Sequence, residues 1–379
     1  MCGIVGYAGY RQAAPLLLDG LSKLEYRGYD SAGVCIQGPE GLEVAKSRGR
    51  LQILSEKIQA RAGLPGLVGV GHTRWATHGA PSDENSHPHL SQNGKIAVVH
   101  NGIIENYLEL RERLTKEGVS FCSDTDTEVV SNLIARLYEE QGDLLEAVRM
   151  AVARLEGSYA LGIVCRDEPG QIIAAKKDSP LIFGFGEGEN FIASDIPAVI
   201  NRTRDIYILD DEELAVVKKD SVSVYDKEGR AIEKKVQKVT WSAEAAEKGG
   251  YPHFMLKEIF EQPKAVRDTV QIHLNKDGSV AFPDLGWTKE CFDNIDNILI
   301  TACGTAYHAG LVAKHYIERF VKIPVAVEIA SEYRYSKPLT TSHTLCIVVS
   351  QSGETIDTLE ALKEAKKHGA KSLAVTNSI

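Results

Sequence analysis

The stretch NILITACGTAYHAGLVAKHYIERFVKIPVAVEI, residues 297–329, decides the fold class of the second half of the chain. Its apolar run at residues 297–301 predicts a buried strand, and residues 305–320 repeat apolar side chains at helical spacing. Val325–Ile329 predicts a second strand. A strand, a helix and another strand in this order form a βαβ unit with parallel strands.

The same alternation continues along the sequence. Residues 344–349 and 372–376 predict two more strands, and residues 355–368 between them predict a helix. This part of the chain is therefore expected to be a doubly wound α/β sheet. Because only about four strands precede Ile379, we expect this domain to be incomplete and the sequence to be a fragment.

Two turns of the expected sheet lead from a strand into a helix. They are CGT at residues 303–305 and SQSGET at residues 350–355. Backbone N–H groups at a helix N-terminus, together with Ser and Thr hydroxyls, form an anion site that suits a phosphate. The alternative is an ordinary turn into a helix capped by Ser or Thr. Because both turns end strands of one sheet, ligand binding is the favoured interpretation.

The first half has a different pattern, with strand-like runs in groups and helical patterns in pairs. The strand-like runs are Gly3–Ala8, 33–36, 67–71, 95–100, 159–165, 172–175, Asn190–Ala193, 206–209 and 214–217, and the helical patterns are 13–25, 105–116, 127–140 and 144–155. This order predicts an α+β sandwich. Residues 219–250, rich in Lys, Glu, Ser and Gly, predict an edge strand followed by a domain joint.

Length and composition limit the classes of function. The 379 residues are enough for about two to three domains. A net charge of −9 argues against nucleic acid or an anionic membrane as the main partner. No apolar run approaches the ~18 residues of a membrane-spanning helix and no signal peptide is recognised, so the cytoplasm is the expected compartment. The seven cysteines include no C-x-x-C pair, so neither a metal site nor a disulfide framework is expected.

Cys2 differs from the other cysteines because it follows the initiator Met1. Removal of Met1 would leave a thiol and a free α-amine on one residue. An α-amine has a pKa of about 7.7–8.0 and can take the thiol proton at neutral pH, directly or through water. Cys2 would then be an N-terminal nucleophile. A buried structural cysteine is the alternative, and by position alone it is the more frequent case.

Three other segments carry groups that would complete a site for an α-amino acid with an amide side chain. Arg74 could hold a carboxylate, although a surface ion pair is its ordinary role. The Asn101 amide and the Gly102 N–H could stabilise an oxyanion, although an Asn-Gly pair is ordinarily a turn. Asp126 could accept from an ammonium group, although residues before a helix ordinarily cap it.

Five motifs in order, MCGIVGY, YRGYDSAG, GHTRWATHG, HNGIIEN and SDTDTEV, resemble the glutaminase domain of the class II, N-terminal-nucleophile glutamine amidotransferases. The resemblance covers about residues 2–220 and implies a four-layer αββα sandwich. It implies Cys2 as the nucleophile, with Asn101 and Gly102 as the oxyanion hole. The residues that it implies around bound L-glutamine are Arg74, Trp75 on a mobile loop, Thr77, His78 and Asp126.

Three later motifs, ILITACGTAYHAG, VEIASEYRY and SQSGETIDTL, resemble the sugar isomerase (SIS) domain family, whose fold is flavodoxin-like. The residues that this resemblance implies for a sugar phosphate are Thr305, Ser350, Gln351, Ser352 and Thr355. The two resemblances divide the chain into a glutaminase domain at 2–219, an interdomain connection at 220–288 and a truncated first SIS domain at 289–379.

Together, the resemblances imply an enzyme of amino-sugar precursor synthesis. It would convert L-glutamine and D-fructose 6-phosphate to L-glutamate and D-glucosamine 6-phosphate, without a cofactor or a metal. They imply a homodimer for the full-length form, and only glutaminase activity for the fragment. One alternative is an amidophosphoribosyltransferase-like enzyme, but we find no phosphoribosyltransferase loop with paired acidic residues. The other is a SIS regulatory module, which would be expected to carry a helix-turn-helix and a basic face.

Overall fold

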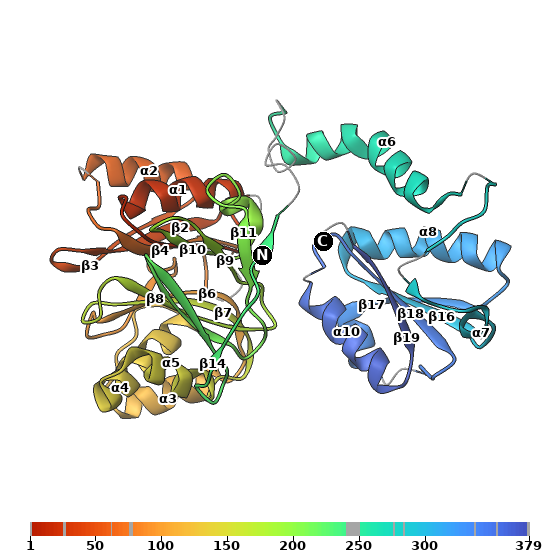
Figure 1. The fold of residues 1–379 in the computed structure, drawn as a ribbon. Coiled ribbons are helices and arrows are strands. Elements are labelled where there is room, and N and C mark those ends of the chain that lie inside the picture. The colour runs from red at the N-terminus through yellow and green to blue at the C-terminus, as the bar shows by residue number, and fades with distance from the viewer. Residues whose placement is uncertain are drawn as a thin grey trace. The chain divides into compact units, whose positions relative to one another are not determined.

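The computed structural model describes residues 2–25, 28–61, 63–75, 79–239, 251–275, 277–282, 285–336, 339–353 and 355–376. The chain divides into two compact units, Met1–Ile259 and Phe260–Ile379 (Figure 1). Each unit has its own sheets and its own hydrophobic clusters.

The described part of the first unit contains two antiparallel sheets. The eight-stranded sheet contains, in spatial order, β15 (Gln237–Lys238), β11 (Asp205–Ile208), β9 (Ile182–Phe185), β10 (Asn190–Ala193), β1 (Gly3–Ala8), β4 (Val68–Arg74), β2 (Ser31–Gly38) and β3 (Gly41–Arg48). The seven-stranded sheet contains β14 (Ala231–Ile232), β13 (Ser221–Tyr225), β12 (Leu214–Lys218), β8 (Gln171–Lys177), β7 (Gly157–Cys165), β6 (Ile96–Ile104) and β5 (His89–Leu90). The first strand in the sequence, β1, is thus a central strand, paired with β10 on one side and β4 on the other.

Helices cover the outer face of each sheet (Figure 1). The helices are α1 (Ala13–Leu24) and α2 (Leu51–Ala60) on the eight-stranded sheet, and α3 (Tyr107–Lys116), α4 (Thr127–Gln141) and α5 (Leu144–Val152) on the seven-stranded sheet. Leu17 and Leu21 of α1 share a buried cluster with Val34 of β2. Leu133 of α4 shares another with Ile163 of β7.

The two sheets of the first unit pack face to face. Ile4 and Val70 of the eight-stranded sheet form one buried cluster with Val99 and Val164 of the seven-stranded sheet. The order of layers is therefore helix, sheet, sheet, helix. This confirms the α+β sandwich and the four layers that the resemblance implied. A short 3₁₀ helix at Ile196–Ala198 follows β10.

The second unit has a parallel sheet with the order β17-β16-β18-β19 among the described residues. Helix α6 (Phe254–His273) includes the division between the units in the sequence. The elements that follow are α7 (Lys289–Asp293), β16 (Asn297–Ala302), α8 (Gly304–Phe320), β17 (Val325–Ile329), α9 (Ala330–Tyr333), β18 (Thr344–Ser350), α10 (Ile356–Lys367) and β19 (Lys371–Thr376). Ile300 lies in a cluster with α8, whereas its neighbour Leu299 lies in a cluster with α10. Because successive strand residues face opposite sides, these helices cover opposite faces, as predicted for a doubly wound sheet.

Some elements differ from the sequence-based expectation. β3 and α2 were not predicted. β3 is a half-exposed edge strand without strict alternation, and α2 is a ten-residue helix with only three buried side chains. The predicted edge strand after residue 219 is the inner strand β13, and β14 forms the edge. None of the helices among the described residues has the length and apolar content to cross a membrane.

Candidate active site

Cys2 lies directly before β1, next to the end of β4. Gly3 pairs with Thr73 in the antiparallel register, so Cys2 and Arg74 come next along the two strands. The backbone N–H of Trp75 donates to Cys2 Sγ at 3.2 Å. Sheet pairing therefore holds the thiol beside the segment that follows β4.

Burial and hydrogen bonding act in opposite directions on the Cys2 thiol. Burial raises its pKa and is the larger influence, whereas the Trp75 backbone and the Arg74 guanidinium lower it. A raised pKa keeps the thiol protonated at neutral pH, so a nucleophilic thiolate requires a base nearby.

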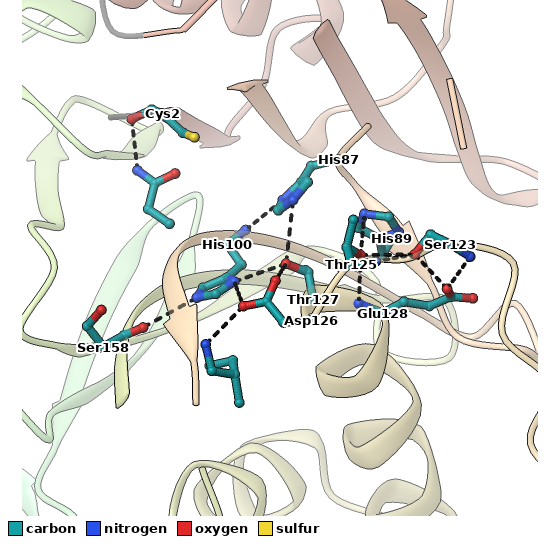
Figure 2. Close-up of polar contacts among 12 residues, drawn as sticks. Cys2, His87, His89, His100, Ser123, Thr125, Asp126, Thr127, Glu128 and Ser158 are labelled. Atoms are coloured by element: carbon teal, nitrogen blue, oxygen red, sulfur yellow. Dashed lines mark hydrogen bonds and ion pairs between the residues drawn. The ribbon is translucent and has the colours of Figure 1, made fainter. Parts of the chain in front are cut away.

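Asn101 reaches Cys2 from the other sheet. It lies in β6, and its Nδ2 donates to the backbone oxygen of Cys2 at 3.0 Å (Figure 2). Its Oδ1 lies 3.0 Å from Nε2 of His72. The amide is thus held between two strands, with its NH₂ group on the side of the nucleophile.

Gly102 follows Asn101 within β6 and does not form a turn. The ordinary interpretation of the Asn-Gly pair as a turn is therefore wrong, because pairing with β7 continues to Ile104. Gly102 has φ +124°, and a Cβ there would lie 2.1 Å from the backbone oxygen of Ser158. Only glycine fits this backbone conformation and this close approach.

Arg74 is buried, so the surface ion pair that was its alternative role is excluded. Its Nη2 donates to the backbone oxygen of Gly79 at 3.2 Å. Burial lowers the pKa of the guanidinium, while Cys2, Asp126 and Asp30 act in the opposite direction. The backbone N–H of Asp30 also donates to the Arg74 oxygen at 3.0 Å, which brings the YRGYDSAG motif beside the candidate site.

Asp126 precedes α4, but its side chain does not cap the helix. Its Oδ2 instead accepts from the backbone N–H of Ile104 at 2.9 Å, so the capping role is wrong. The same oxygen lies 3.9 Å from His100 Nδ1 (Figure 2). Asp126 is therefore tied to the end of β6, the strand that carries Asn101.

The remaining residues predicted around glutamine lie on the segment after β4. Trp75 is 46% exposed and contacts Tyr29 edge-on, with ring centroids 5.4 Å apart. Thr77 and His78 lie outside the described residues.

Sequence reasoning missed a cluster of buried histidines next to this site: His72, His87, His89 and His100. The rings of His72 and His87 stack at 4.1 Å. Burial lowers the pKa of His72 to about 3, and the pKa values of His87 and His89 lie well below the usual value for the same reason. The available signal was five histidines within residues 72–100, three of which lie in strands of the structure.

The two predicted turns of the second unit follow neighbouring strands. Residues 303–305 follow β16 and residues 350–355 follow β18, and these two strands pair in parallel. Numbered within this unit, the strand order is 2-1-3-4, so the turns lie at the switch point where doubly wound sheets bind ligands.

Hydroxyl groups shape the second of these turns. Ser350 Oγ accepts from the Gly353 N–H at 3.1 Å and lies 3.2 Å from Thr355 Oγ1. Thr305 and Gln351 are exposed, and Ser352 is half-buried. The structure thus brings the predicted polar groups to one edge of the sheet.

Comparison with known proteins agrees with this two-part architecture. Residues 72–201 match the glutamine amidotransferase domain family, and residues 292–378 match the SIS domain family. Glutamine–fructose-6-phosphate aminotransferase [isomerizing] of Clostridium tetani is 58% identical over 381 residues, which cover 100% of this chain and 62% of that protein. The chain is thus similar to the glutamine–fructose-6-phosphate aminotransferases and carries matches to both of these domain families.

Other aminotransferases of the same name also match the chain along its whole length. A protein of the same name from Thermus thermophilus is 49% identical, with 100% of this chain and 61% of that protein covered. The chain thus spans about three fifths of the length of these aminotransferases.

A solved structure supports the fold. Glutamine phosphoribosylpyrophosphate amidotransferase from B. subtilis superposes with a TM-score of 0.54 at 18% identity, covering 100% of this chain and 82% of that one. At this identity the likeness shows the fold alone, and it agrees with the four-layer sandwich of the first unit.

Proposed function

We propose that the first unit hydrolyses L-glutamine, with Cys2 as the nucleophile. We further propose that the whole protein transfers the released ammonia to D-fructose 6-phosphate and forms D-glucosamine 6-phosphate. The observation that carries the proposal is the 3.0 Å hydrogen bond from Asn101 Nδ2 to the backbone of Cys2. It brings an amide donor from the seven-stranded sheet beside the residue that would supply the nucleophile.

The chemistry proceeds through a thioester. With Met1 removed, the α-amine of Cys2 takes the thiol proton, and Sγ attacks the amide carbon of glutamine. The Asn101 NH₂ group and the Gly102 N–H stabilise the oxyanion. The proton passes to the leaving nitrogen and ammonia departs. Water then attacks the thioester carbon, which releases glutamate and regenerates the thiol.

Charged side chains would select the substrate. Arg74 binds the α-carboxylate and Asp126 the α-ammonium group of glutamine, and both are buried within the first unit. Trp75, Thr77 and His78 complete this proposal on the segment after β4.

The second unit would receive the sugar phosphate. The turns after β16 and β18 supply backbone N–H groups at two helix N-termini, a suitable environment for a phosphate. The residues assigned to this site are Thr305, Ser350, Gln351, Ser352 and Thr355. The domain limits at 219/220 and 288/289, the homodimer and the cytoplasmic location stay predictions.

A glutaminase assay tests the proposal. The chain with Met1 removed, as verified by mass spectrometry, should release glutamate from glutamine. Cys2→Ala should lower the turnover at least about 10⁴-fold, because the nucleophile is lost. A tag retained before Cys2 should do the same, since it blocks the α-amine. Cys122→Ala, at an exposed cysteine of the same unit, is the matched control and should keep wild-type turnover.

Undiminished glutamate release by Cys2→Ala or by the tagged form would rule out this mechanism. A second assay with both substrates measures glutamate and glucosamine 6-phosphate separately. For the 379 residues alone we expect glutamate without amino sugar, and equal yields of both products would contradict that expectation.

A further inference from the structure

His72 links the two sheets directly behind the proposed oxyanion hole. It lies in β4 and is only 1% exposed. Its Nε2 lies 3.0 Å from the backbone oxygen of His100 and 3.0 Å from Oδ1 of Asn101, both in β6. The ring thus contacts the amide that reaches Cys2.

The contact with His100 determines which nitrogen of His72 carries the proton. A backbone oxygen can only accept, so Nε2 of His72 must be the protonated nitrogen and must donate. The Asn101 atom that faces this N–H must then be an acceptor, which is Oδ1. The NH₂ group of Asn101 is therefore left on the opposite side, where it donates to the backbone oxygen of Cys2.

Neighbouring contacts place a proton on Nε2 of two other rings as well. His87 Nδ1 accepts from the backbone N–H of His100 at 3.2 Å, so its Nε2 is protonated and points to Thr127 Oγ1 at 3.4 Å (Figure 2). His100 Nε2 faces the Ser158 oxygen at 3.5 Å, so this nitrogen is protonated too. His72, His87 and His100 thus each carry a proton on Nε2.

Burial keeps the His72 ring neutral. It lowers the pKa of the ring to about 3, and the nearby His100 and Arg74 act in the same direction. Above about pH 5, nearly every molecule therefore has a neutral ring with a single N–H.

We propose that His72 is a positioning residue of the oxyanion hole: its Nε2–H fixes the orientation of the Asn101 amide, so that the NH₂ group faces the tetrahedral intermediate. The inference rests on the proposed glutaminase activity and deepens it. Without His72, only the bond to the Cys2 oxygen orients the Asn101 amide, and an amide oxygen turned toward the oxyanion would repel it.

Steady-state kinetics with two substitutions test the proposal. His72→Leu keeps an apolar side chain but removes the donor, and should lower kcat about 10- to 100-fold, less than deleting an oxyanion donor outright. KM for glutamine should stay within about threefold, because ground-state contacts are not changed. His72→Gln places an amide donor near the position of Nε2, and should recover most of the lost kcat.

A matched control separates positioning from general destabilisation. His89 lies in the same buried cluster but hydrogen-bonds Thr125, and no described contact links it to Asn101. His89→Leu should lower Tm about as much as His72→Leu, while kcat stays within about twofold of wild type. Alkylation of Cys2 by a small haloacetamide, mapped by mass spectrometry, needs no oxyanion hole and should be equally fast in all variants.

The proposal is overturned if His89→Leu lowers kcat as much as His72→Leu, or if folded His72→Gln is no better than His72→Leu. If the Leu variant fails to fold, ¹⁵N-histidine NMR of the wild-type chain decides. A neutral Nε2–H ring for His72 at pH 7 supports the proposal, and an Nδ1–H ring or a doubly protonated ring overturns it. A wild-type chain without glutaminase activity would contradict the proposed function itself, whereas active wild type with an active Leu variant contradicts only this inference.

Discussion

The candidate site of the first unit and that of the second differ in which part of the chain supplies the polar groups. Around Cys2 they are buried side chains from separate elements: Asn101 from β6, Arg74 from β4 and Asp126 from the start of α4. In the second unit, the turns at residues 303–305 and 350–355 offer backbone N–H groups and partly exposed hydroxyls.

This difference corresponds to the chemistry proposed for each site. A covalent step needs donors held to within about 0.5 Å, which buried and mutually bonded side chains provide. A phosphate can be held by several backbone donors at a helix N-terminus, each of modest importance. We therefore expect changes of single side chains to be costly in the first unit and mild in the second.

The largest expected effect is acid unfolding of the first unit. Below about pH 6.5 the unfolded chain protonates its histidines, while burial keeps the pKa of His72 at about 3 and holds those of His87 and His89 well below the usual value. The unfolded state then binds more protons, so the free energy of unfolding falls as the pH falls. The slope should approach about 1.4 kcal/mol per pH unit for each histidine.

Urea titrations between pH 6.5 and 5, followed by circular dichroism, measure this slope. His89→Leu removes one of the three groups, and should reduce the slope by about 1.4 kcal/mol per pH unit. A stability that does not change over this range would mean that the histidines are not buried in the neutral form.

The next effect concerns Arg74. Arg74→Ala removes a buried cation proposed to bind the glutamine carboxylate, and this should cost about 2–5 kcal/mol of binding. KM for glutamine should therefore rise about 30-fold or more. Arg113→Ala is the control, because that side chain is 46% exposed on α3. Similar KM values for the two variants would remove Arg74 from the proposed site.

Gly102 tests how far the backbone of β6 tolerates change. Gly102→Ala places a Cβ 2.1 Å from the Ser158 oxygen at φ +124°, and should destabilise the first unit by about 2–4 kcal/mol and lower kcat. Gly94 also has a positive φ, +66°, but no atom lies within 4 Å of where a Cβ would be added. Gly94→Ala should therefore destabilise the first unit by only about 1 kcal/mol. Equal changes in Tm for the two variants would show that the close contact with Ser158 is not limiting.

The smallest effect is expected in the second unit. Ser350→Ala removes one hydroxyl from the turn after β18, but leaves the backbone N–H groups in place. The affinity for fructose 6-phosphate, measured by calorimetry, should fall by about 0.5–1.5 kcal/mol, or about 2- to 13-fold. A loss of more than about 100-fold would show that side chains dominate this site as well, and would end the contrast between the two units.

Much of the fold could be predicted because the strands of both cores are short apolar runs. β10 and β17 have the predicted boundaries, since Glu189 and Ser194 flank β10 and Pro324 precedes β17. Helix α2 was missed although Leu51, Leu54 and Ile58 give it one buried face, a pattern that a search at helical spacing would detect.

The candidate site was less accessible to sequence reasoning. Cys2, Arg74 and Asn101 could be proposed from their chemistry, and the structure brings the first and the last within a hydrogen bond. The part played by His72 could not be predicted, because its contact with Asn101 crosses between two sheets. Spacing along one strand tells which residues share a face, but not which side chain of another sheet they meet.

The central position of β1 has a consequence for how the protein folds during translation. This strand is made first, yet its neighbour β10 consists of residues 190–193. At about 5–20 residues per second, translation needs roughly 10–40 s to reach β10. During that time one edge of β1 has no partner strand, and Cys2 lies at the end of an unfinished sheet. The order of synthesis therefore leaves this end of the chain within reach of an aminopeptidase before the surrounding sheet can be completed.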